Sequence, residues 1–168
     1  MPDPIIVVPS VKLKWKGIFD FEGLYKKMKY WLEFQGYGDE KNNFREVKYT
    51  ERIKPTGKNY EIIWVGEKII SDYFSFNIKI TFLGLYIQKV EVQRQSRKIQ
   101  MDKGEIEMKF TATLVKNRQD RWNPSSVIKK IYENFITKDR IEEYKIDIYK
   151  KTYEFLDEVK AYLDLSRV

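Results

Sequence analysis

Two segments of the chain alternate strictly between apolar and polar residues, which is the pattern of a half-buried β-strand. The first covers residues 74–82 and the second residues 105–116. Weaker alternation predicts strands over residues 11–19, 44–53, 60–65 and 85–95, and residues 96–101 are a candidate for one more. Gly84 allows either a hairpin turn or a bulge in a longer strand, and we favour the turn. Together with turns at residues 54–58 and 102–104, this predicts a curved antiparallel sheet of about six strands.

Three other segments place apolar residues three or four positions apart, which is the spacing of an amphipathic helix. Asp20 is a suitable N-cap for the first helix, and Gly36 is a suitable stop. Pro124 opens a short helix to about residue 136, and Asp139 caps a long one over residues 139–163. The fold class is therefore α+β, with one N-terminal helix and a long C-terminal helix packed across the sheet.

The apolar face of the long helix is unusually broad. A first stripe has the spacing of a face that covers a sheet, and a second stripe lies beside it: Ile146, Tyr149, Tyr153 and Leu156. Apolar residues around so much of a helix need a partner. We expect a cavity, a neighbouring helix or another subunit.

The length and composition indicate a single folded domain. The chain has 168 residues, of which 42% are hydrophobic, enough for a packed core. Residues 1–10 contain three prolines, and we expect them to form an extended arm. Residues 11–168 form the single α+β domain.

The residue inventory argues against an enzyme. Cysteine and histidine are absent, which excludes disulfides, thiolate nucleophiles, histidine-based triads and the commonest metal sites. The sequence contains neither a phosphate-binding loop nor a calcium-binding loop. Most carboxylates fall on predicted polar faces, so we expect no catalytic residue, no cofactor and no metal. No apolar run approaches the length of a membrane span, and we expect a cytoplasmic protein.

The formal net charge of +7 is compatible with binding to nucleic acid or another anion. The basic residues are scattered and mixed with acidic ones, which favours an ordinary solvated surface. The best candidates for anion contacts lie together in the loop before Pro124: Arg118, Arg121 and Trp122. A cation–π contact within that loop explains the same residues and is the reading we favour.

Aromatic and aliphatic residues on the alternating strands and on the long helix are the candidates for lining a ligand cavity. They are Phe74, Phe76, Ile78, Ile80, Met108, Phe110, Tyr149 and Tyr153. The same residues could fill an ordinary solid core, which is the alternative we favour slightly from packing alone.

The predicted order of elements resembles the helix-grip arrangement of the Bet v 1 and START-like superfamily over about residues 11–163. In that superfamily a long helix closes a curved sheet over a hydrophobic cavity. The resemblance implies a non-enzymatic binding protein for a hydrophobic or amphipathic small molecule. Two alternatives stay open: a structural or assembly protein, or homo-oligomer, that binds other chains through the C-terminal helix and the N-terminal arm, and a basic nucleic-acid-binding domain.

Overall fold

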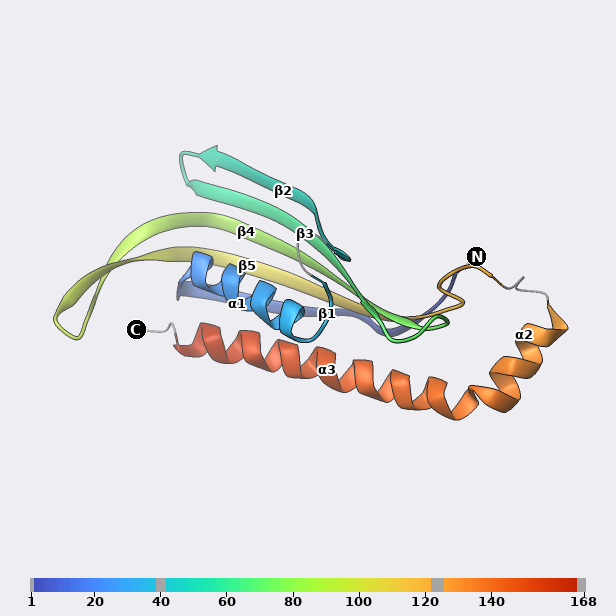
Figure 1. The fold of residues 1–168 in the computed structure, drawn as a ribbon. Coiled ribbons are helices and arrows are strands. Elements are labelled where there is room, and N and C mark those ends of the chain that lie inside the picture. The colour runs from blue at the N-terminus through green and yellow to red at the C-terminus, as the bar shows by residue number, and fades with distance from the viewer. Residues whose placement is uncertain (1, 39–41, 122–125, 166–168) are drawn as a thin grey trace.

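The computed structural model describes residues 2–38, 42–121 and 126–165. It is an α+β fold with one open antiparallel sheet, in the strand order β1-β5-β4-β3-β2. The sheet is curved, and α1 and α3 both lie on its concave side (Figure 1). The elements in chain order are β1 (Asp3–Phe19), α1 (Phe21–Phe34), β2 (Phe44–Lys54), β3 (Gly57–Ile69), β4 (Ser75–Arg94), β5 (Arg97–Lys116), α2 (Val127–Ile131), the short π-helix η1 (Tyr132–Ile136) and α3 (Lys138–Leu165).

The structure confirms the predicted boundaries of α1. The side chain of Asp20 accepts a hydrogen bond from the Gly23 amide at 3.1 Å, so Asp20 is the N-cap. Gly36, just past the helix, has a φ of +88°, a conformation that glycine adopts without a steric penalty. Both signals are local, because each depends only on a few neighbouring residues.

The sheet has five strands rather than the predicted six, because β4 and β5 run through the expected turns at Gly84 and Gly104. A bulge between Leu85 and Gln88 bends β4. A Cβ atom on Gly104 would lie 2.6 Å from Ile87 Cδ1 and 2.8 Å from the Leu85 carbonyl oxygen. Glycine there allows two bent strands to approach closely, and it does not mark a turn.

The turn between β4 and β5 lies instead at Gln95 and Ser96, where both residues have positive φ, 47° and 64°. Tight hairpins favour this backbone conformation, but usually with asparagine, aspartate or glycine at these positions. The sequence of this turn therefore carries little signal. Residues 85–95 and 96–101 belong to the two long strands.

The proline-rich N-terminal residues are extended and belong to β1, where Asp3 pairs with Lys116 and Val8 pairs with Ala112. Pro4 and Pro9 cannot donate backbone hydrogen bonds, and β1 is an edge strand in which one side needs no donors. Register shifts follow Ile6 and Val8. The expected arm is thus part of the sheet.

Helix α3 begins at Lys138, so Asp139 lies in its first turn rather than at the N-cap. Its buried face comprises Ile148, Thr152, Phe155, Leu156, Val159 and Leu163. The Phe155 ring meets Phe110 of β5 at 5.5 Å and stacks on Trp31 of α1 at 4.2 Å between centroids. This contact joins both helices to the sheet. Pro124, the predicted start of the preceding helix, lies outside the described residues.

Candidate functional site

Six of the eight predicted cavity residues are fully buried in the core between the sheet and the two helices α1 and α3. Phe74 and Phe76 meet the ring of Tyr144 edge to face at 5.2 and 5.8 Å, and Phe110 meets Phe155. These rings pack directly against one another. Ile78, Ile80 and Met108 complete the set.

The other two predicted cavity residues lie on the outside of α3. Tyr149 is 49% exposed and Tyr153 is 37% exposed, and their rings contact each other at 4.7 Å between centroids. They follow the buried Ile148 and Thr152 by one position each, and one residue turns a helix by about 100°. Tyr149 and Tyr153 therefore do not share a space with the other six. Leu156, predicted on the same stripe, is buried.

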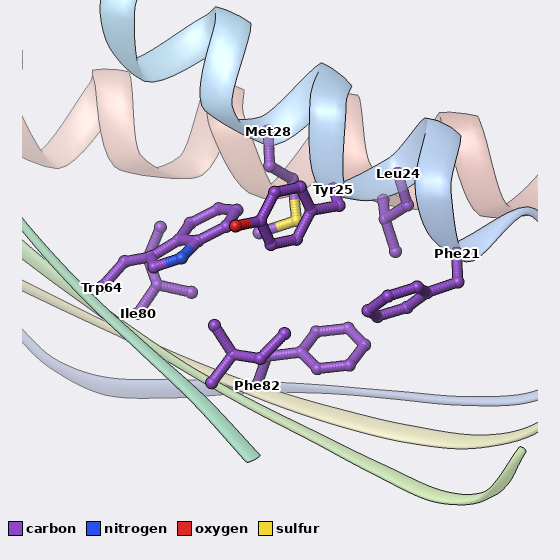
Figure 2. A pocket seen from close by; sticks show the side chains of 8 residues that line it. Phe21, Leu24, Tyr25, Met28, Trp64, Ile80 and Phe82 are labelled. Atoms are coloured by element: carbon purple, nitrogen blue, oxygen red, sulfur yellow. The ribbon is translucent and has the colours of Figure 1, made fainter. Parts of the chain in front are cut away.

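A small cavity lies beneath α1, between this helix and strands β3 and β4 of the sheet (Figure 2). It is lined by Phe21, Leu24, Tyr25, Met28, Ile62, Trp64, Ile80 and Phe82. Figure 2 shows the helix side chains pointing down toward Trp64, Ile80 and Phe82 on the strands. The cavity volume is about 10 Å³, room for about one water molecule.

Glu46 of β2 links the polar ends of two rings in the cavity wall. It accepts hydrogen bonds from the Tyr25 hydroxyl at 2.5 Å and from the Trp64 indole at 2.8 Å. The two rings meet edge to face at 4.9 Å. Because Glu46 satisfies both donors, the ring bodies of Tyr25 and Trp64 are left as apolar walls.

A larger open cleft, which we call the aromatic cleft, lies next to the cavity at the N-terminus of α1. Its volume is about 390 Å³, and its lining residues are Phe21, Glu22, Tyr25, Tyr49, Tyr60, Lys89 and Asp102. Phe21 and Tyr25 also line the cavity. The Phe21 ring stacks on Tyr60 at 4.6 Å, and Tyr49 stands at 69° to Tyr60 with its centroid 6.4 Å away. The rings form adjoining walls.

Asp102 is the buried polar group of the aromatic cleft, with only 4% of its surface exposed. Its Oδ2 atom accepts a hydrogen bond from the Phe21 amide at 3.0 Å, and its Oδ1 atom lies 2.9 Å from the Lys89 ammonium. Asp102 therefore satisfies an amide in the first turn of α1. The sequence pattern predicts a turn at Asp102, because no local signal shows that β5 continues through it.

Tyr49 and Tyr60 of the aromatic cleft remain neutral at physiological pH. Burial raises the pKa of Tyr60, and the negative charge of Glu51 raises it further. Burial likewise raises the pKa of Tyr49, with Glu51 as the next largest cause. Each ring therefore presents an intact phenol to the cleft.

The structure describes two of the three predicted anion-contact residues, Arg118 and Arg121. The Arg118 guanidinium lies 3.8 Å from the Glu67 carboxylate. The backbone amide of Arg118 donates a hydrogen bond to the Tyr73 carbonyl oxygen at 3.2 Å. Arg121 is exposed. Trp122 lies outside the described residues, so the predicted contact with it is untested.

The lysine-rich part of β1 separates its charges from its aromatic residue. Lys14 and Lys16 lie 3.7 and 3.2 Å from Glu107 and Glu105 of β5. Trp15, between them in the strand, is packed against the core on the other face. Stacking of nucleic-acid bases needs exposed rings beside the charges, and this strand does not place them together.

The described residues also give evidence on two other classes of site. None of their helices is both long and apolar enough to cross a membrane. The same residues contain no group of three or more acidic side chains that could hold a metal ion.

Comparison of the chain with protein-family models, curated proteins and solved structures found no match in any of the three. Functional inference therefore depends on the geometry of the chain itself.

Proposed function

We propose that the protein is a non-enzymatic, helix-grip binding protein for a hydrophobic or amphipathic small molecule. The observation that supports this best is that the aromatic cleft and the apolar cavity beneath α1 are neighbours, because both are lined by Phe21 and Tyr25. The apolar part of a ligand would enter between α1 and the sheet. Its polar part would remain in the cleft, where the hydroxyls and charged groups are.

The dimensions require the inner cavity to widen when a ligand binds. The aromatic cleft, at about 390 Å³, falls within the range of small-molecule pockets. The inner cavity is much smaller, so an apolar tail must displace side chains from its walls. Met28 lies in that wall, and the unbranched methionine side chain adapts readily to a new neighbour.

The polar groups around the cleft support binding rather than catalysis. Asp102 is held by the Phe21 amide and by Lys89, and Glu46 is held by Tyr25 and Trp64. A carboxylate engaged in this way positions its neighbours and is not poised to take a proton from a substrate.

Replacing Phe21 with alanine should weaken binding of a neutral fluorescent probe, N-phenyl-1-naphthylamine, by about tenfold or more, because the ring forms part of both spaces. Fluorescence titration measures the dissociation constant. Phe34→Ala is the matched control, since Phe34 lies at the other end of α1 and is 73% exposed. Circular dichroism checks that both variants are folded.

The wild-type protein should bind the probe saturably, and Phe34→Ala should bind it equally well. Absence of saturable binding to the wild type would contradict the proposed function. Equal weakening by both variants would contradict the proposed site.

Assembly with other chains is a second candidate function, favoured by the exposed apolar residues on the outer side of α3. Ile146 is 54% exposed beside the Tyr149 and Tyr153 pair, and such patches commonly mark interfaces. On this hypothesis, light scattering over a concentration series should show self-association that Tyr149→Lys removes. A wild-type monomer at every concentration would contradict a homo-oligomer formed through this face.

A further inference from the structure

We propose that the polar end of the ligand is a cation, an alkylated ammonium group seated in the aromatic cleft. This inference rests on the proposed function, because it assigns the chemistry of the head group at the same site. The tail enters the cavity beneath α1, and the ammonium remains among Tyr49, Tyr60 and the nearby carboxylates. The ligand is then a cationic amphiphile.

The cleft offers several aromatic surfaces to one small volume. Tyr60 is stacked on Phe21, and Tyr49 stands at 69° to Tyr60, so the two tyrosines form adjoining walls. Tyr25 closes the side toward α1, with its ring tilted at 45° to Phe21. The faces of aromatic rings attract cations, and walls of several rings suit quaternary ammonium groups, which cannot donate hydrogen bonds.

Asp102 already holds an ammonium group in this cleft. Its Oδ1 atom lies 2.9 Å from the Lys89 Nζ atom. The Asp102 side chain is 6% exposed whereas that of Lys89 is 68% exposed, so the carboxylate is part of the wall and the lysine reaches it from solvent. The lysine can move into solvent when the ammonium of the ligand takes its place, because the buried carboxylate then keeps a positive partner. The position of Lys89 therefore shows that this wall of the cleft accepts a positive charge.

An anionic head group would find its usual donors occupied. Amide groups in the first turn of a helix attract anions. At α1 the Phe21 amide donates to Asp102 at 3.0 Å, and the Gly23 amide donates to Asp20 at 3.1 Å. Two carboxylates of the chain itself thus occupy these positions, and they add negative charge near the cleft.

The charged groups that shift the pKa values of Tyr49 and Tyr60 indicate the sign of the electrostatic potential in the cleft. After burial, the largest cause that raises the pKa of Tyr49 is the charge of Glu51, followed by that of Glu46. For Tyr60 the acidic contributions come from Glu51 and Asp102, and Lys58 opposes them at both rings. A field that disfavours phenolate favours a bound cation. The net charge of +7 acts the opposite way at long range.

Calorimetry with three amphiphiles of the same tail tests the head group on the intact chain. The probes are decyltrimethylammonium, decyl sulfate and the neutral decyldimethylphosphine oxide, each below its micelle concentration. We expect the trimethylammonium compound to bind about tenfold more tightly than the sulfate, with a preference that decreases as salt is added.

The outcomes separate this proposal from the one it rests on. Equal affinity for all three probes, or a preference for the sulfate, would overturn the cationic head group and leave the proposed function standing. Binding of none of them would contradict both.

Lys89→Met provides a second test, because it removes the competing ammonium from the cleft. We expect the variant to bind decyltrimethylammonium about three- to tenfold more tightly than the wild type. Lys79→Met is the matched control, an exposed lysine on the same strand whose neighbours Ile78 and Ile80 face the core. A gain from both variants alike, or no gain from Lys89→Met, would overturn the assignment of Asp102 as the cation-binding group.

Discussion

Replacing Phe155 with alanine is expected to lower the free energy of unfolding by about 3–5 kcal/mol, the range for large aromatic residues removed from a core. Phe155 is 1% exposed. Its ring contacts Trp31 of α1 and Phe110 of β5, so the variant leaves a cavity where both helices meet the sheet. Chemical denaturation followed by circular dichroism measures the change.

Tyr153→Ala is the control for this prediction, because it removes a large ring from the same helix two positions earlier. The Tyr153 side chain points away from the sheet and contacts Tyr149. We expect a loss of about 1 kcal/mol or less. Equal losses from Phe155→Ala and Tyr153→Ala would contradict the orientation of α3 on the sheet.

Glu133→Gln is expected to lower the free energy of unfolding by about 2–3 kcal/mol, less than for a fully buried ion pair because the site is partly solvated. Glu133 accepts a hydrogen bond from the Tyr73 hydroxyl. Its carboxylate also lies 3.1 Å from the Lys116 ammonium and 3.8 Å from that of Lys129. Asp3 shares both lysines, at 3.0 and 3.5 Å. Without the charge of Glu133, one carboxylate faces two nearly buried ammonium groups.

The pKa of Lys116 supports this expectation. Burial by itself would lower the pKa, but hydrogen bonds to Asp3 and Glu133 raise it above the ordinary value. The charged network is therefore favourable in place, although the two lysine side chains are nearly buried.

Thermal unfolding and amide hydrogen exchange measure the effect of Glu133→Gln, with the largest loss of protection expected in α2 and η1. Glu142→Gln is the matched control, because Glu142 forms an exposed pair with Lys145 at 3.2 Å. Exposed pairs of this kind contribute little. If Glu133→Gln were no more destabilising than Glu142→Gln, the network would not hold α2 and η1 to the sheet.

The alternation of apolar and polar residues identifies the core side of the strands but not the places where the strands bend. Alternation identified Phe76, Ile80 and Phe110 as inward residues. It could not show that Gly84 and Gly104 lie inside long strands, because each glycine accommodates a close contact with a neighbouring strand, Tyr60 of β3 at Gly84 and Leu85 of β4 at Gly104.

Two residues that line the cavity beneath α1 show how far the prediction reached. Ile80 was among the candidates for lining a ligand cavity, whereas Trp64 lay on a predicted strand and had no predicted role. In β2, strict alternation would put Val47 and Tyr49 on one face. A bulge between Glu46 and Lys48 instead brings Glu46 and Tyr49 to the concave side, while Val47 is exposed. One extra residue reverses the facing of every later side chain.

The sequence by itself determined the α+β class, the cap of α1 and the two strictly alternating strand segments, because these depend on residues within a few positions of one another. The tertiary structure alone decided the aromatic cleft. Its residues come from α1, β2, β3, β4 and β5. They meet because bulges and close glycine contacts curve the sheet around the start of α1, and no local pattern encodes that curvature.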